Sequence, residues 1–277
     1  MTQEQKTLGH WLAFLSDAEI PVLRHTAREI ARLRENEDNL GARDVALVVV
    51  QDPMMTARLL RHLQAHKHKS QTHDLVEIEQ TLMMMGISRF FEILPPEPTV
   101  EETLRGHMEA LVQLMHVVLR ARRASCYAMD WALLLYDLHA EEIRIAALLH
   151  DLAEMLMWIY APVEMLKIRQ MQTADKTLRS KDAQTQVLGF TLAELHSEVA
   201  AAWDLPELLL NLMEDAHAET RRVKNVKLAV DLARHSANGW DDAALPDDYA
   251  GIAELLRMKQ EEVMAMLVPK PAEPEPG

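Results

Sequence analysis

The chain has 277 residues, of which 49% are hydrophobic and 26% are charged, so it can form a globular core and is not a disordered polypeptide. Its 43 acidic residues outnumber its 29 lysines and arginines, and the resulting net charge of −14 argues against general nucleic-acid binding. Glycine is rare (8 residues), methionine is plentiful (17 residues) and helix formers dominate, so we expect an all-α fold.

The first half of the chain is predicted to form short helices. Four segments have apolar residues at helical spacing: 20–36, 42–51, 53–66 and 75–86. Pro53 cannot continue the helix before it but can begin the next one, and Gly86 is a typical residue after a helix C-terminus. We interpret residues 1–97 as an N-terminal subdomain of short helices.

The segment "ILPPEPTV" (93–100) is the clearest break, because three prolines in five residues stop a helix. Thr99 and Glu102 then form a T-x-x-E capping box, and Thr191 and Glu194 form another. Longer helices are predicted after this break: 100–136, 140–160, 161–172, 180–188, 192–203, 206–217, 222–237 and two short ones after 245. The second subdomain spans residues 98–268, and the proline-rich acidic tail 269–277 is expected to be extended or disordered. We therefore expect a multi-helix bundle in which the first subdomain packs on the second.

Three local features bear on the cellular compartment. The single Cys126 cannot form an intrachain disulfide, which suits a reducing cytoplasm, and we expect it to be a buried thiol. The N-terminus lacks the apolar core of a signal peptide, and no apolar run is long enough to span a bilayer. Two basic runs, "HKHK" (66–69) and "RARR" (120–123), are interpreted as solvated helix surface. A cytoplasmic protein that binds neither membrane nor nucleic acid is expected.

The stretch "AALLHDLAEML" (146–156) places His150 beside Asp151 in an apolar helix. Such a dipeptide can supply half of the ligands of a metal-dependent phosphohydrolase, which needs further donors from other helices. His116, near the middle of the long helix, is a plausible third donor. The candidates for a fourth donor on late helices are Asp204, Asp215, His217, Asp231 and His235.

The chain resembles the HDOD (HD-related output domain) family over most of its length. The matching segments are "IPVLRHTAREIARL", "VVVQDPMMTARLLRHL", "VEIEQTLMMMGISRFFEI", "AALLHDLAEMLM" and "LGFTLAELHSEVAAAWDLPELLLNLM". The "QDPMMTARLL" segment and the "GFT…AE…W.LP" segment are the most specific, and the order and spacing of the whole set carry the resemblance. It implies an all-helical domain with an HD-like second half.

The HDOD family is related to the HD phosphohydrolases, which bind metal through a His, a His-Asp pair and a distant Asp. By resemblance, His116 takes the first position, and His150 with Asp151 takes the second. Arg234 stands where the distant Asp is expected, although an alignment shifted by one helical turn would place Asp231 there. Two further departures are Leu192, where relatives commonly have a histidine, and "EDAH" (214–217), where many have a His-His pair.

An arginine at the ligand position has a physical consequence, because a guanidinium stays protonated and repels a divalent cation. It could also pair directly with Asp151 in place of the ion. His116 and His150 would then be neutral core histidines.

The favoured hypothesis is a non-enzymatic signal-transduction output or adaptor module of bacteria. It would have a degenerate HD site and no cofactor, and it would bind a partner protein or a nucleotide second messenger. The alternative is a phosphohydrolase acting on a nucleotide or cyclic dinucleotide. It would use iron, manganese or zinc held by His116, His150, Asp151 and Asp231. A third hypothesis is an oligomerisation scaffold, whose mark would be a large apolar patch outside the core.

Overall fold

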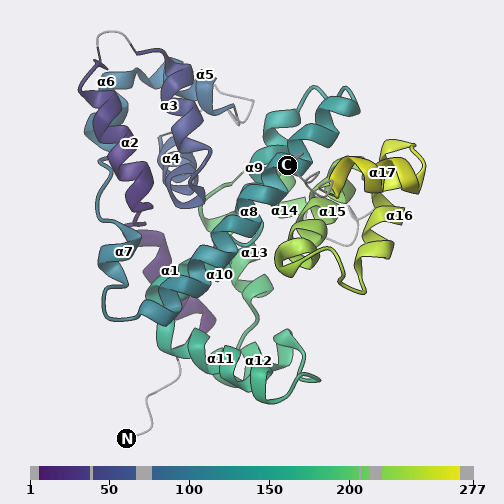
Figure 1. The fold of residues 1–277 in the computed structure, drawn as a ribbon. Coiled ribbons are helices and arrows are strands. Elements are labelled where there is room, and N and C mark those ends of the chain that lie inside the picture. The colour runs from purple at the N-terminus through teal and green to yellow at the C-terminus, as the bar shows by residue number, and fades with distance from the viewer. Residues whose placement is uncertain (1–5, 38–39, 67–76, 206, 212–219, 269–277) are drawn as a thin grey trace, which may run out of the picture.

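A computed structural model describes residues 6–37, 40–66, 77–205, 207–211 and 220–268. All regular secondary structure in these ranges is helical, which confirms the all-α prediction (Figure 1). The only β-type contact within these ranges is an isolated bridge between Val22 and Thr99. The predictions for residues 67–69, for the tail 269–277 and for the candidate donors Asp215 and His217 lie outside the described residues.

Short helices fill the first hundred residues. They are α1 (Leu8–Asp17), α2 (Arg24–Arg34), α3 (Ala42–Val49), α4 (Pro53–Ala65), α5 (Ile78–Met85), α6 (Ile87–Ile93) and α7 (Val100–Thr103). Two of these, α1 and α6, were not predicted. Gly86 ends α5 with a φ of 85°, as expected for a glycine at a helix C-terminus.

The second part begins with the longest helix. Its elements are α8 (Met108–Leu134), α9 (Ala140–Leu149), α10 (Leu152–Tyr160), α11 (Pro162–Ala174), α12 (Ser180–Leu188), α13 (Leu192–Ala202), α14 (Glu207–Asn211), α15 (Arg221–His235), α16 (Leu245–Leu256) and α17 (Gln260–Leu267). None of the helices in the described part of the chain combines the length and the apolarity needed to cross a membrane.

Two long helices predicted from sequence are each divided in the structure. The capping box of Thr99 and Glu102 forms as predicted, but it begins the four-residue α7, and α8 starts only at Met108. The predicted helix 140–160 is interrupted at His150 and Asp151, so that α9 ends directly before the dipeptide and α10 begins directly after it. The apolar periodicity runs through both breaks, which is why the sequence pattern did not reveal them.

The buried carboxylate of Asp52 joins two helix N-termini in the first half. Its Oδ1 accepts hydrogen bonds from the N–H groups of Met54 (2.9 Å) and Met55 (3.2 Å) at the start of α4. Its Oδ2 accepts a hydrogen bond from Leu23 N–H (2.7 Å), directly before α2. One side chain thereby caps α4 and fixes the position of α2 against it.

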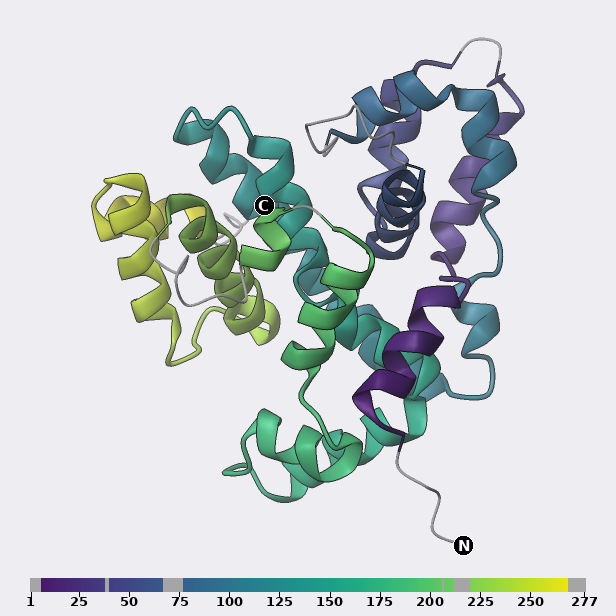
Figure 2. The ribbon, with the colours of Figure 1, turned by 180° about the vertical axis from the view of Figure 1, so that it is seen from behind.

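The helices form two groups on either side of α8 (Figure 1). Helices α2 to α6 lie on one side, and α15 to α17 lie on the other. Helices α9, α10 and α15 pack against α8, and α1 packs against α13 (Figure 2). Trp131, Trp158 and Trp203 are buried in the core.

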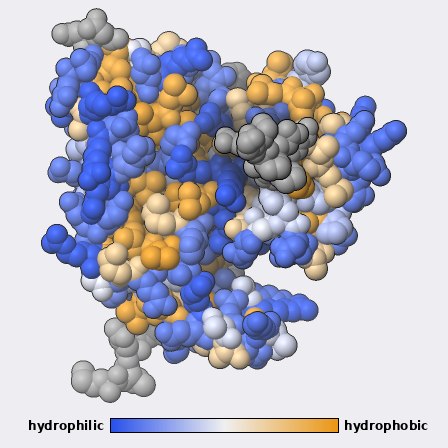
Figure 3. Space-filling model, viewed as in Figure 1, coloured by the Kyte–Doolittle hydropathy of each residue, from blue (hydrophilic) through white to orange (hydrophobic). Residues whose placement is uncertain are grey.

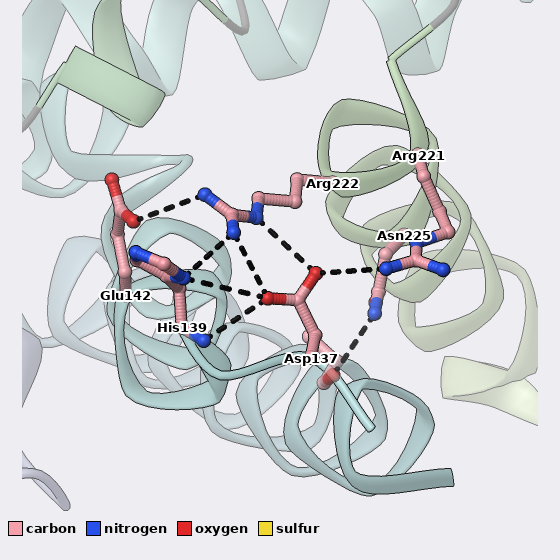
Figure 4. A network of polar contacts seen from close by, with 7 residues as sticks. Asp137, His139, Glu142, Arg221, Arg222 and Asn225 are labelled. Atoms are coloured by element: carbon pink, nitrogen blue, oxygen red, sulfur yellow. Dashed lines mark hydrogen bonds and ion pairs between the residues drawn. The ribbon is translucent and has the colours of Figure 1, made fainter. Parts of the chain in front are cut away.

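A polar clasp holds the turn between α8 and α9 against the start of α15 (Figure 4). The side chain of Asp137 is only 5% exposed and accepts hydrogen bonds from the His139 backbone N–H (3.0 Å) and Arg222 Nε (3.2 Å). Arg221 adds an ion pair at 3.5 Å. Burial disfavours the charged carboxylate, but these hydrogen bonds and positive charges outweigh that effect and lower the pKa of Asp137.

We expect Asp137→Asn to lower the free energy of unfolding by about 2 kcal/mol at neutral pH, because a buried charge-assisted network loses its anion. A lowered carboxyl pKa stabilises the fold above the ordinary aspartate pKa, so this contribution disappears as the pH falls below about 4. Urea unfolding of both proteins between neutral and acidic pH measures the difference, with Asp182→Asn on the exposed surface as control. A difference that stays constant down to pH ~3 would contradict this assignment.

Candidate functional site

His150 and Asp151 lie between α9 and α10 and interact directly. His150 Nδ1 is 2.7 Å from Asp151 Oδ1, and the two side chains are 23% and 24% exposed. Because the ionised carboxylate can only accept, His150 Nδ1 is the donor in this hydrogen bond. The dipeptide therefore forms an oriented His-Asp pair at the surface of the helical core.

Glu154 and Arg120 extend this pair into a polar cluster. Glu154 lies one helical turn after His150 and accepts a hydrogen bond from Trp158 Nε1 (3.2 Å). Arg120 of α8 forms an ion pair with Glu154, with Nη2 and Oε2 3.7 Å apart. Neither residue was predicted from sequence; the available signal was the spacing "HDLAE", which puts a second carboxylate on the same face of α10.

The electrostatics of the cluster favour an ionised Asp151. Burial acts against the charge, but the hydrogen bond from His150 and the positive charges of Arg120 and Arg234 lower the pKa of Asp151 to about 2. Burial and the neighbouring charge of Asp151 raise the pKa of Glu154, against the opposing effect of Arg120. Two guanidinium groups thus act on the carboxylates of this site.

The sequence left open whether Arg234 or Asp231 takes the position of the distant aspartate ligand, and both residues lie on α15. The two side chains form an ion pair with each other, one helical turn apart, and among the described residues no hydrogen bond or ion pair joins Arg234 to Asp151. The charge of Arg234 nevertheless contributes to the lowered pKa of Asp151 and opposes the raised pKa of Glu154.

His116 differs most from expectation. It is exposed on α8, one helical turn before Arg120, so the prediction of a neutral core histidine is wrong for this residue. The apolar neighbours of His116 belong to the buried side of α8, whereas position 116 points outward. Within the described ranges, no three His, Cys, Asp or Glu side chains are placed to hold one metal ion.

A second histidine near the pair, His196 of α13, was not predicted from sequence. Its side chain is buried, and Nε2 has no hydrogen-bond partner among the described residues. Burial and the nearby positive charge of His150 lower the pKa of His196 to about 4, while Asp151 opposes the shift. His196 lies one helical turn after Leu192, the position at which the resemblance to the family predicts a histidine. That spacing of four residues was the signal that sequence reasoning could have used.

The sequence of the chain matches the model of the HDOD domain over residues 20–219. The chain belongs to the HDOD family. The matched region includes the His-Asp pair, Glu154 and His196, whereas α15 with Asp231 and Arg234 follows it. A search of curated proteins finds no match.

Three solved structures have a similar fold. The MmoQ response regulator of Methylococcus capsulatus is 15% identical, with a TM-score of 0.67 over 92% of this chain and 100% of its own. A virulence factor of Campylobacter jejuni is 16% identical, with a TM-score of 0.64 over 90% of this chain and 89% of its own. An HDOD domain protein of unknown function from Geobacter sulfurreducens is 16% identical, with a TM-score of 0.50 over 94% of this chain and 93% of its own. At these identities the likeness shows the shared fold alone.

Proposed function

We propose that this HDOD protein is a non-enzymatic output or adaptor module of bacterial signal transduction, acting in the cytoplasm through a partner protein or a nucleotide second messenger. The proposal is supported by membership of the HDOD family and by the likeness in fold to a response regulator. The net charge of −14 favours such a partner over nucleic acid.

One observation carries the non-enzymatic part of the proposal. Arg120 and Arg234 both act on the carboxylate of Asp151, where a metal centre would require further anionic or neutral donors. Asp231, the remaining carboxylate proposed as a ligand, is itself paired with Arg234. We infer that fixed positive charge has replaced the ion and that the HD site is degenerate.

One feature favours the alternative, a metal-dependent phosphohydrolase. Nε2 of buried His196 has no hydrogen-bond partner in the described part of the chain, lies near His150 and Asp151, and is a type of donor that iron, manganese and zinc accept. The two hypotheses therefore differ in metal binding, which can be measured on the purified protein.

The test combines metal analysis with hydrolysis assays. Purified protein incubated with iron, manganese or zinc and then passed through a desalting column is expected to retain less than stoichiometric metal. It is also expected to show no turnover of nucleotides or cyclic dinucleotides. Arg234→Asp should increase manganese retention by removing a positive charge and adding a carboxylate, whereas Arg234→Gln, the matched control, should increase it less.

Stoichiometric metal in the wild-type protein, together with hydrolysis that Asp151→Asn abolishes, would overturn the adaptor proposal and establish the alternative. The same purified protein, immobilised, can be used to recover partners from the source cell. Variants of Arg120 and Arg234 would show whether the polar cluster takes part in that binding.

A further inference from the structure

One face of α8 stays exposed along most of its 27 residues. Val112, Leu119, Cys126 and Leu133 lie on it at intervals of seven residues, and all four are exposed, Leu119 by 50% and Leu133 by 55%. The prediction of a buried Cys126 is therefore wrong. A seven-residue apolar repeat keeps to one side of a helix, and it is the pattern by which two helices pair.

The exposed apolar surface continues beyond the end of α8. Tyr136 and Leu138 are 91% and 92% exposed, and Leu134 is 54% exposed. Asp137, between Tyr136 and Leu138, is held in the clasp of Figure 4, so the turn that carries these two side chains is fixed. A rigid apolar projection binds with less loss of conformational entropy than a mobile one.

Figures 1 and 3 show the same view of the molecule, with α8 on the near side. Hydrophobic residues reach the surface of this face in several patches separated by hydrophilic ones (Figure 3). The residues of the α8 face match that mixed character, because Arg123 and Asp130 are exposed between the apolar positions.

The spacing of these residues is self-complementary about Cys126. Leu119 lies seven residues before it and Leu133 seven after it, and Arg123 and Asp130 lie three before and four after. Two copies of α8 packed antiparallel at this centre would place Leu119 against the partner subunit's Leu133. Arg123 would then lie beside the partner subunit's Asp130. A parallel arrangement would instead place like charges together at both positions, which is unfavourable.

We propose that a second copy of this chain binds along the exposed face of α8, antiparallel, with the two-fold axis at Cys126. The inference is independent of the proposed signalling function, since it rests on α8 and on the turn after it. A helix of this length covers a strip of about 400 Å² on each partner, which is below the ~800 Å² typical of stable complexes. We therefore expect a reversible dimer that dissociates on dilution.

The first test is the mass in solution over a wide range of protein concentration, by sedimentation equilibrium. The full chain is expected to change from its monomer mass of 31.6 kDa to twice that value as concentration rises. Leu119→Glu should weaken dimerisation at least tenfold, because it buries a carboxylate in an apolar contact. Leu47→Glu, at a 55% exposed leucine of α3, is the matched control and should leave the dimer unchanged.

The second test uses the only cysteine of the chain as a reporter of the axis. A disulfide requires Cα atoms about 4.4–6.8 Å apart, so mild copper-catalysed oxidation by dioxygen should link two chains only if the Cys126 residues face each other. Cys126→Ser should give no linked dimer. Arg123→Asp should weaken dimerisation, and adding Asp130→Arg should restore it.

Two results would overturn the proposal. One is a monomer at every concentration reached. The other is a dimer that persists in Leu119→Glu and is not linked through Cys126, because such a dimer must use another surface. Circular dichroism of each variant checks that these exposed substitutions leave the helical content intact.

Discussion

Asp52→Ala is expected to lower the free energy of unfolding by about 4 kcal/mol, the largest effect of any single substitution proposed for this chain. Three buried backbone N–H groups, of Leu23, Met54 and Met55, would lose their acceptor in a region that water does not reach. The loss includes both the capping of α4 and the contact that positions α2, so it exceeds that of an ordinary helix cap.

Urea denaturation followed by circular dichroism measures this effect. Asp44→Ala is the matched control, because Asp44 accepts one hydrogen bond from Gly41 N–H at an exposed helix start. We expect it to cost less than about 1 kcal/mol. Asp52→Asn should give an intermediate loss, since its amide oxygen can still cap α4 while its NH₂ group opposes Leu23 N–H. Equal decreases in the free energy of unfolding for Asp52→Ala and Asp44→Ala would contradict the prediction that burial of Asp52 increases its contribution to stability.

The second large effect is a dependence of stability on pH that originates at His196. Its pKa of about 4 in the folded protein lies below the ordinary histidine value of 6.5, so the unfolded chain binds a proton that the folded chain does not. The stability that depends on neutral His196 is complete above pH ~6.5 and is lost as the pH falls toward 4. At about 1.4 kcal/mol for each pH unit, the loss over this range is about 3 kcal/mol.

The measurement is the free energy of unfolding of the wild type and of His196→Leu as a function of pH, in buffer with a chelator so that metal binding does not contribute. The variant should lack this loss, because leucine fills the buried site without a titratable group. His116→Gln, which changes an exposed histidine, should retain the wild-type profile. Parallel profiles for the wild type and His196→Leu would contradict the assignment of the pH dependence to this residue.

The roles of Asp52 and His196 differ in how far they can be predicted from the sequence. Asp52 stands in "QDP", where proline at the first helical position and aspartate before it mark a helix start. Its second role, as acceptor for Leu23 N–H, links positions 29 residues apart and has no local pattern. The only sequence signal of His196 is its spacing of four residues from Leu192, and its burial is set by residues of other helices.

The candidate site shows the same division. The His-Asp dipeptide was found from its own letters and an apolar setting, and Arg234 was found from its place in a family pattern. That Arg234 pairs with Asp231 yet acts electrostatically on Asp151 depends on how α15 packs against α8. The rotation of α8 about its axis, which exposes His116 and Cys126, is likewise decided by that packing.

The sequence by itself determined the helical class, most helix positions, the capping boxes and the His-Asp pair, because these depend on contacts within a few residues along the chain. The tertiary structure alone decided the break before the long helix, the break at the dipeptide, the burial of His196, and which face of α8 stays exposed. Those features depend on contacts between segments distant in sequence. The free energies of these contacts outweigh the local helix propensity and apolar periodicity, which continue without interruption through the same positions.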